Sequence, residues 1–308
     1  MNIREITPTD FDAVRRVDRL AWAEFAKTKG AARLRTRTNI LSNWSEAPHG
    51  CFLAEEEREV LGYVFSHIWG RLGWVGTFGV RPESRGQGIG KILLEKSVRY
   101  LEQKGCTTIG LETRPENLYN LGMYVSQKFQ PRYLTLWMSS QTHGRATERF
   151  GVECSKLEYA EQKNMIDRFR AICESIQPGL DYTKAGRLRV RYKEGEIIAF
   201  GNRRKPLGFA VVRTESTRLR EPFQDLLVEA LVIRPGYESK FTGILRILSG
   251  FARKWGKSNI LVPVNTRNWR VTRTLATEGF CIRRAMLRMV YKEQKIDDRH
   301  LNLNLWMM

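Results

Sequence analysis

The chain has 308 residues, of which 42% are hydrophobic, 28% charged and 10% aromatic. This length predicts about two domains, and the composition excludes a chain that is disordered over most of its length. The 52 Lys and Arg against 33 Asp and Glu give a net charge of +19, with 22 basic and 16 acidic residues in 1–150 and 30 and 17 in 151–308. An anionic partner is expected, such as a phosphorylated cofactor, an acidic substrate or a nucleic acid, although a solvated basic surface explains the charge equally well.

Three classes of protein are excluded by local composition. No uncharged apolar run reaches the ~18 residues that a membrane span needs, and the first residues form no secretory signal. The five cysteines are scattered, without a Cys-x-x-Cys pair, at Cys51, Cys106, Cys154, Cys173 and Cys281. This pattern argues against a disulfide framework or a structural zinc site. We therefore expect a cytoplasmic protein that uses no metal and no membrane.

Hydrophobic spacing predicts alternating strands and helices along the first half of the chain. The expected elements are a strand at 2–7, a helix at 11–26, a second helix ending near Trp44, strands at 51–54, 60–68 and 74–80, a helix at 89–104, a strand at 108–113, a helix at 115–127 and a strand at 133–138. The polar segment that follows indicates a linker.

Four features of the first half recur in the second half in the same order. They are Leu61-Gly-Tyr63 with Leu207-Gly-Phe209, Val80-Arg-Pro82 with Ile233-Arg-Pro235, Asn117 with Asn268, and Lys128-Phe129 with Gly279-Phe280, at offsets of 146 to 153 residues. Matching elements lie between these features. The pattern predicts a tandem duplication, with a domain at 1–140, a linker at 141–150 and a second domain at 151–308.

The most informative motif is the glycine-rich segment Val80-Arg-Pro-Glu-Ser-Arg-Gly-Gln-Gly-Ile-Gly90, between a predicted strand and a predicted helix. Its glycines allow positive φ and leave space for a ligand to approach the main chain. The first N–H groups of a helix have no internal partner and lie at the positive end of its dipole, so they can bind phosphate. Arg85 adds a cation with paired donors. The motif predicts a phosphate site, with a simple glycine-rich turn as the alternative.

This segment resembles the signature of the GNAT acyltransferase superfamily, which binds the pyrophosphate of acetyl-CoA. The signature is Arg/Gln-x-x-Gly-x-Gly/Ala after a strand that ends in Val-x-Pro. Arg85, Gly88 and Gly90 match it, with Val80 and Pro82 ahead of them.

Residues further along the chain extend the resemblance. Asn117, Tyr124 and Phe129 are similar to the family's Asn…Leu-Tyr-x-x-x-Gly-Phe segment, although Lys128 replaces its usual Gly. The resemblance covers essentially all of 1–140 and, in weaker form, the second half. It implies a mixed α/β (α+β) fold repeated in tandem. In this fold, a twisted and mostly antiparallel sheet is flanked by helices, and two strands splay apart at the cofactor cleft.

The resemblance also implies an N-acetyltransferase, which moves the acetyl group of acetyl-CoA to an amine by direct attack in a ternary complex. Pantetheine would pair with the free edge of strand 74–80. The residues expected to bind acetyl-CoA are Phe78, Gly79, Val80, Arg85, Gly86, Gln87, Gly88, Ile89, Gly90 and Asn117. Asn117 either binds pantetheine or caps the following helix. Tyr124 is the candidate proton donor to the departing thiolate, because a phenol keeps its proton at neutral pH; a packed helix aromatic is the alternative.

The general base is less well defined. Many family members place a Glu on the strand before the glycine-rich loop, but strand 74–80 has no carboxylate here. Glu112 on the neighbouring strand is the expected catalytic substitute, and His67 is another because its reference pKa is suitable. A water chain, or an acceptor that arrives neutral, would replace both.

The family's acceptor surface corresponds to about 25–44 and 130–136 in this chain. Four arginines would make that surface basic, namely Arg33, Arg35, Arg37 and Arg132. This charge favours an acceptor with a carboxylate or phosphate near its amine, and a solvated basic loop is the alternative.

The second half is expected to lack an acetyl-CoA site of its own. The replacements, from first half to second, are Arg85 to Glu238, Gly88 to Phe241 and Tyr124 to Leu275. A carboxylate would repel the phosphates, and a benzyl group would fill their space. Glu229 is a reservation, because it corresponds to Gly76, near where many relatives keep their base. The second half would then be a packing partner in an internal pseudo-dimer, and the chain a monomer.

A second hypothesis is a nucleic-acid-associated protein whose basic second half binds phosphates near aromatic residues. Its candidate contacts are Arg203-Arg-Lys205, Arg253-Lys-Trp255 and Arg283-Arg284. This hypothesis is not favoured, because the sequence has no helix-turn-helix, RNP or zinc pattern and its charges are dispersed. A third hypothesis is an acyl-CoA sensor without catalysis, in which Tyr124 points away from the thioester.

Overall fold

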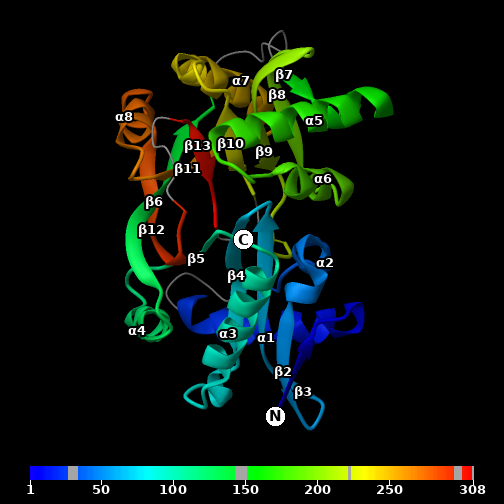
Figure 1. Ribbon diagram of the computed structural model, residues 1–308, viewed down its shortest axis with the longest axis vertical. Helices are drawn as coiled ribbons and strands as arrows, with labels where there is room; N and C mark the ends of the chain where they lie inside the picture. The colour runs from blue at the N-terminus through cyan, green and yellow to red at the C-terminus, as the bar shows by residue number, and fades with distance from the viewer. Residues whose placement is uncertain (27–33, 143–150, 221–222, 295–299, 307–308) are drawn as a thin grey trace.

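The computed structural model describes residues 1–26, 34–142, 151–220, 223–294 and 300–306. Its two halves have the same order of elements, and Figure 1 shows one half above the other. The first half comprises β1 (Asn2–Glu5), α1 (Phe11–Ala26), α2 (Arg37–Glu46), β2 (Phe52–Glu56), β3 (Glu59–Trp69), β4 (Leu72–Val80), α3 (Ile89–Gln103), β5 (Thr108–Thr113), α4 (Leu118–Ser126) and β6 (Gln130–Gln141). The second half comprises β7 (Gly151–Glu153), α5 (Tyr159–Ile176), α6 (Thr183–Arg191), β8 (Gly195–Asn202), β9 (Lys205–Arg213), β10 (Asp225–Ile233), α7 (Phe241–Lys254), β11 (Asn259–Asn265), α8 (Trp269–Thr277) and β12 (Cys281–Lys292), followed by the additional strand β13 (Asn302–Asn304).

The elements predicted in the first half are all present, with some shifted ends. The helix expected from 115 begins at Leu118, because the Asn117 side chain accepts a hydrogen bond from the Asn120 N–H and caps it. Strand β6 is longer than the predicted 133–138, because both of its edges are paired. Most of the predicted linker 141–150 lies outside the described residues, so the limits 1–140 and 151–308 stay a prediction.

All thirteen strands belong to one sheet, in which the last long strands of the two halves are exchanged. The order is β1-β2-β3-β4-β5-β12-β6-β11-β10-β9-β8-β7, with β13 beside β10. Strand β12 of the second half therefore lies between β5 and β6 of the first half. Strand β6 in turn pairs with β11 of the second half. Figure 1 shows β6 and β12 as long neighbours that run alongside both halves. The mixed α/β fold expected from the sequence is confirmed, and the exchange is its unexpected feature.

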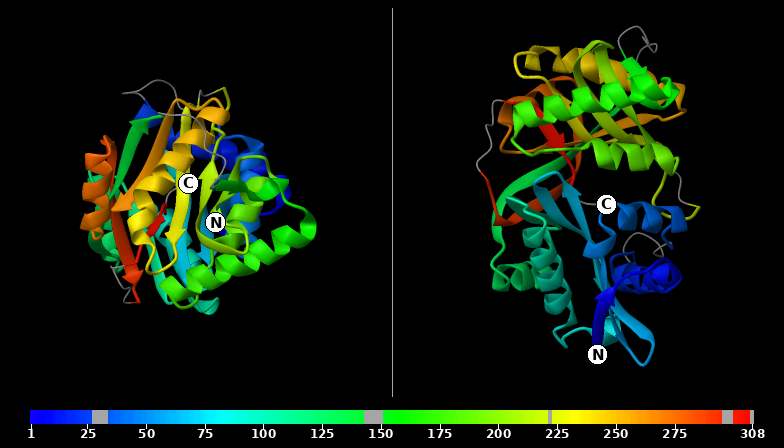
Figure 2. Two further views of the ribbon diagram at one scale, coloured as in Figure 1. Left: turned by 90° about the horizontal axis from the view of Figure 1, so that it is seen from above. Right: turned by 45° about the vertical axis from the view of Figure 1, so that its right-hand side comes forward.

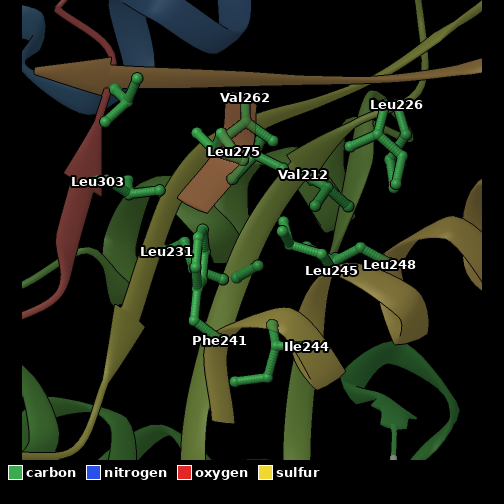
Figure 3. Packing of buried hydrophobic residues seen from close by; sticks show 14 of the residues in the cluster. Val212, Leu226, Leu231, Phe241, Ile244, Leu245, Leu248, Val262, Leu275 and Leu303 are labelled. Atoms are coloured by element: carbon green, nitrogen blue, oxygen red, sulfur yellow. The ribbon is translucent and has the colours of Figure 1, made fainter. Parts of the chain in front are cut away.

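Helices cover both faces of this sheet (Figure 2). In the first half, α3 and α4 pack on one face and α1 and α2 on the other. In the second half, α7 and α8 form one layer and α5 and α6 the other. Figure 3 shows Ile244, Leu245 and Leu248 of α7 against buried residues of the sheet. Trp69 and Trp74 of the first half share a core with α5 and α6, so the two halves are packed together through side chains as well as strands.

None of the described helices is both long and apolar enough to cross a membrane. The described residues also contain no group of three or more His, Cys, Asp or Glu side chains that could hold a metal ion.

Candidate functional site

The first half contains two parallel strands that separate. Strand β4 pairs with β5 only from Leu72 to Trp74, opposite Thr108 to Gly110, and the pairing stops there. Beyond that point β4 has a bulge, because the register with β3 passes from Ser66↔Val75 to Val64↔Phe78. Two residues of β4, Gly76 and Thr77, thus oppose one residue of β3. A bulge and a parted strand pair leave backbone groups of β4 available to a ligand.

A cavity of about 1000 Å³ opens at the carboxyl end of these strands. Its lining comes from α1, the end of β4, the glycine-rich loop, the start of α3 and the inner face of α4. Nine of the ten residues expected to bind acetyl-CoA line it: Phe78, Gly79, Val80, Arg85, Gly86, Gly88, Ile89, Gly90 and Asn117. Gln87 is not among the lining residues. The structure therefore brings the predicted cofactor residues together around one space.

The glycine-rich loop forms an open cradle at the first turn of α3. Gly86 and Gly88 both have φ of +80°, and a Cβ added at either would have no other atom within 4 Å. At Gly90, by contrast, an added Cβ would lie 3.1 Å from Cζ of Phe78, so this glycine allows close packing of the helix on β4. Arg85 Nη2 donates to the Ala21 carbonyl at 3.0 Å, which fixes the guanidinium at the cavity. Free N–H groups at a helix start beside a guanidinium suit a phosphate.

Asn117 fulfils both of its expected roles in geometry. Its Oδ1 accepts a hydrogen bond of 3.0 Å from the Asn120 N–H, which caps α4, and the residue also lines the cavity. Its counterpart Asn268 caps α8 in the same way, by accepting from the Val271 N–H at 3.2 Å. The cap therefore belongs to the repeated fold, and only in the first half does it border this cavity.

Tyr124 lies on α4 but is not among the residues that line the cavity. Its side chain is 6% exposed, and its ring packs 6.0 Å from that of Phe129. Burial raises the pKa of its phenol well above the usual value, so the hydroxyl keeps its proton. A donor role and a packing role both remain consistent with this position.

Glu112 is fully buried and ion-paired. Its Oε1 accepts from Arg288 Nε at 2.9 Å, from Arg288 Nη2 at 2.5 Å and from Thr135 Oγ1 at 2.5 Å. Its Oε2 is buried and has no hydrogen-bond partner among the described residues. Only Oε2 is thus available to accept a proton, and the exchanged strand β12 supplies the arginine that holds the other oxygen.

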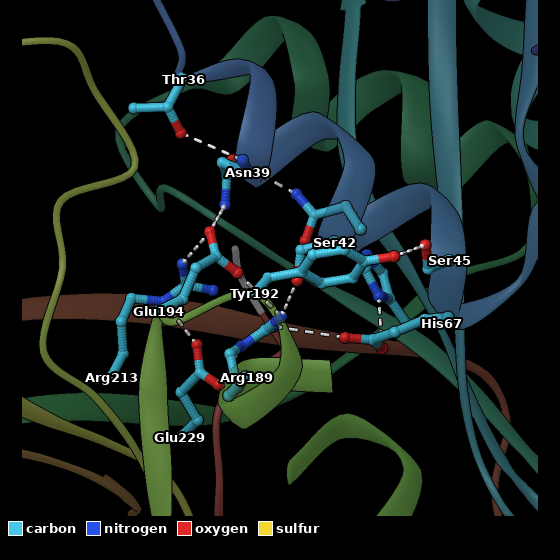
Figure 4. A network of polar contacts seen from close by, with 12 residues as sticks. Thr36, Asn39, Ser42, Ser45, His67, Arg189, Tyr192, Glu194, Arg213 and Glu229 are labelled. Atoms are coloured by element: carbon cyan, nitrogen blue, oxygen red, sulfur yellow. Dashed lines mark hydrogen bonds and ion pairs between the residues drawn. The ribbon is translucent and has the colours of Figure 1, made fainter. Parts of the chain in front are cut away.

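His67 lies on β3 beneath the bulge of β4. Its ring is fully buried, stacks on Trp74 at 4.0 Å between centroids and contacts Glu46 Oε2 through Nδ1 at 2.8 Å. A Cβ added at Gly76 would lie 2.3 Å from His67 Nε2, so the imidazole fills the space above that glycine. His67 thereby joins the buried charge network shown in Figure 4.

The arginines expected at the acceptor surface are already paired with carboxylates. Arg35 is buried against Asp18 at 3.0 Å, and Arg37 reaches Asp12 at 3.2 Å. Arg132 Nε lies 3.3 Å from Glu293 Oε2. Arg33 lies outside the described residues. The three described arginines therefore have their charge balanced within the protein.

The second half repeats the parted strands but fills the gap with its own chain. Strand β10 pairs in parallel with β11 only from Asp225 to Leu227, which repeats the β4–β5 pairing at an offset of 153 residues. Past that point, Ala230 to Val232 pair with β13, which lies where β4 of the first half has a free edge. Leu303 of β13 points into the core beside Leu231 and Leu275 (Figure 3).

The residues that replace the loop and the tyrosine are built into this second core. Phe241 is 3% exposed and Leu275 is fully buried. Glu238 Oε2 accepts from the Gly236 N–H at 2.9 Å, which closes its own turn. Glu229, at the position of Gly76, accepts from Arg189 Nε and Arg213 Nε at 2.7 Å each, so it serves in an ion-pair network.

Comparisons with known proteins agree with this geometry. A profile of the acetyltransferase (GNAT) family matches residues 14–129. An uncharacterized N-acetyltransferase of Methanocaldococcus jannaschii is 33% identical over 141 residues, which are 43% of this chain and 83% of that protein. This chain belongs to the GNAT family. It is an acyltransferase of the kind that uses acetyl-CoA.

Two solved structures share the fold of the whole GNAT chain. A candidate acetyltransferase from Pyrococcus horikoshii superposes with a TM-score of 0.69 at 18% identity, covering 99% of this chain and 94% of that one. A tandem GNAT protein from the clavulanic acid biosynthesis pathway gives a TM-score of 0.60 at 13% identity, covering 96% and 99%. At these identities the likeness concerns the fold alone.

The residue that sequence reasoning missed in this GNAT site is Arg288. It is 176 residues from Glu112 and comes from the other half, yet it supplies two of the three hydrogen bonds to the expected base. The alternation of Arg284, Met286 and Arg288 along one strand was the available signal, because buried arginines on an apolar strand imply a carboxylate nearby.

Proposed function

We propose that the chain is an N-acetyltransferase whose first half binds acetyl-CoA and transfers the acetyl group to an amine by direct attack in a ternary complex. The observation that carries this proposal is the joint position of the parted β4–β5 pair and the open glycine-rich cradle around one cavity. The pyrophosphate would lie on the N–H groups at the start of α3, beside Arg85. Pantetheine would extend along the free edge of β4, as an added strand does.

The thioester would lie at the bulge of β4, near Gly76 and Thr77. A main-chain N–H aimed at the thioester oxygen stabilises the oxyanion of the tetrahedral intermediate, an effect of about 3 kcal/mol for one donor in other acyl transfers. The bulge supports this role because it removes backbone groups from the regular ladder with β3. When the intermediate collapses, the C–S bond breaks and the thiolate of CoA requires a proton.

Tyr124 is the proposed source of that proton. Its raised pKa favours the neutral phenol, which is the form that can donate. Glu112 Oε2 is the proposed acceptor of the proton that the attacking amine releases, since the other oxygen is held by Arg288 and Thr135. The second half would bind no acetyl-CoA and would support the sheet as an internal pseudo-dimer, so the monomer would be the working unit.

A turnover screen tests this function directly. The full chain is incubated with acetyl-CoA and panels of amines, amino acids, polyamines and N-terminal peptides, and released CoA is read as free thiol. Acetylated product and thiol should appear in equal amounts for at least one class of amine. Thiol release that does not depend on any amine, or the absence of acetyl-CoA binding by calorimetry, would contradict the proposal.

A further inference from the structure

Two arginines from different halves lie on the same face of the exchanged sheet. Glu112 and Arg114 are two residues apart at the end of β5, so their side chains project from one face. Across the ladder, Arg288 pairs with Glu112, and Arg284 lies four residues earlier on the same face of β12. Arg284 therefore extends the row that begins with the Glu112–Arg288 pair toward the end of β5 where Arg114 follows.

Arg284 is held by an aromatic ring and has a second guanidinium as its main electrostatic neighbour. Its Cζ lies 5.3 Å from the centroid of Trp137, the residue opposite it on β6. Burial and the charge of Arg114 lower the pKa of Arg284, and Glu116 offsets this only in part. Within the described ranges, Arg284 has no ion pair. Two like charges held close together in a half-buried place are stabilised by an anion between them.

The cations nearby on β6, β12 and the β11–α8 connection differ from Arg284 in this respect. Arg288 faces Glu112, and Arg132 and Arg267 both face Glu293 at 3.3 and 3.6 Å. The positive charge that the protein leaves unbalanced on this row is thus concentrated at Arg284 and its neighbour.

This row ends next to the cofactor cavity. The Asn117 N–H donates to the carbonyl of Arg114 at 3.1 Å, and Asn117 is the first residue of the α4 segment that lines the cavity. Arg114 is thus one turn away from the cavity wall, on the strand that also carries Glu112.

We propose that Arg284, together with Arg114, binds an anionic group of the acceptor, a carboxylate or a phosphate close to the amine that is acetylated. This inference rests on the proposed acetyl transfer and names the chemical class of its acceptor. The guanidinium of Arg284 offers paired N–H donors to two oxygens, and Trp137 holds it in one orientation. The second half thereby contributes a residue to substrate recognition in the first half.

The test uses Arg284→Gln, with Arg283→Gln as its matched control, because Arg283 is the adjacent residue of the same strand and is exposed. Full-length proteins are saturated with CoA, so that the cradle at Gly88 is occupied, and are titrated with inorganic phosphate or with acetate at constant ionic strength. The wild type and Arg283→Gln should bind one anion with equal affinity. Arg284→Gln should weaken binding by about tenfold or more, since a hydrogen bond to a charged group is lost. Arg284→Lys, which keeps the charge without the paired donors, should fall between them.

The two probes distinguish the source of the anion, because the preferred one identifies phosphate or carboxylate as the recognised group. Equal losses in Arg283→Gln and Arg284→Gln would overturn the proposal, since they would indicate a general basic surface. Unchanged binding in a folded Arg284→Gln protein would overturn it as well.

Turnover separates this inference from the proposed function. With acceptors that differ only in carrying an acid or its amide, Arg284→Gln should raise the KM of the acid alone and leave the KM of acetyl-CoA unchanged. Anion binding that depends on Arg284 in a chain that acetylates no amine would contradict the proposed function and leave the anion site in place.

Discussion

Arg189 of α6 and Glu46 of α2 form a buried ion pair between the two halves, with Nη2 and Oε1 3.2 Å apart and side chains that are 0% and 1% exposed. Figure 4 shows how this pair continues into a network. Arg189 also donates to Glu229 at 2.7 Å and lies 3.4 Å from Glu194, while Glu46 reaches His67. The polar contacts at this junction thus join the halves where the shared sheet does not.

Replacing Arg189 with Met should destabilise the protein strongly, by about 3–5 kcal/mol, because Glu46 and Glu229 would be left buried without their partner. Urea unfolding followed by far-UV circular dichroism measures this change. The control is Arg187→Met on the exposed side of the same helix, which should stay within about 0.5 kcal/mol of the wild type. Similar losses in both variants would assign the effect to the helix rather than to the network.

The same network predicts how stability depends on pH. Burial alone would raise the pKa of Glu229, but Arg189 and Arg213 outweigh it and the pKa is lowered; Glu46 is lowered likewise, despite burial, by His67 and Arg189. A lowered pKa in the folded state stabilises the protein above the unfolded value of about 4.3, and this contribution is lost as pH falls through the folded value. The urea midpoint should therefore be flat from pH 7 to about 5.5 and fall below about 4.5. A weaker acid dependence is expected in Arg189→Met, and an identical one would count against this origin.

Gly88→Trp should abolish binding of acetyl-CoA by filling the cavity at the start of α3. A side chain there also costs about 1 kcal/mol of backbone strain, because φ is +80°. Gly105→Trp is the matched control, since Gly105 lies past the other end of α3 with φ of +75° and equally open space. Calorimetric titration should show wild-type affinity for Gly105→Trp. Unchanged affinity in folded Gly88→Trp would remove the cradle from the binding site.

Tyr124→Phe should lower turnover by about 10- to 1000-fold with little change in acetyl-CoA affinity, because it removes a proton donor and keeps the ring. Tyr291→Phe is the control, since Tyr291 packs 5.7 Å from Phe129 in the same cluster. Steady-state kinetics on an amine found active in the screen gives both values. Full activity in Tyr124→Phe would leave Tyr124 with a packing role only.

Titration with acetyl-CoA should give one site per chain. In the second half, Phe241 occupies the place of the cradle glycine, and β13 is hydrogen-bonded to the edge of β10. Gly88→Trp should then bind no acetyl-CoA at all. A stoichiometry near two in the wild type, or residual binding of half the sites in the variant, would show that the second cleft is open.

The extent to which sequence predicted this protein follows the range of each signal. Hydrophobic periodicity and the glycine-rich loop act within ten or twenty residues, so the elements of the first half and the cofactor residues could be read directly. The contact of Arg37 with Asp12 joins two different helices, and that of Glu112 with Arg288 spans 176 residues. No local pattern encodes such pairs. The basic segment was therefore interpreted as an open acceptor surface, although its described arginines are neutralised by carboxylates, and the exchange of β6 and β12 was not foreseen.

The exchange of β6 and β12 also has a consequence for synthesis on the ribosome. The edge of β5 that β12 covers is complete once Thr113 has been made, but its partner strand begins only at Cys281. At ~5–20 residues per second, roughly ten to thirty seconds of translation separate the two. During that interval a nascent strand edge is open to pairing with other chains. Neither half can close its sheet alone, so the yield of native protein depends on how well that edge is protected until the second half has been made.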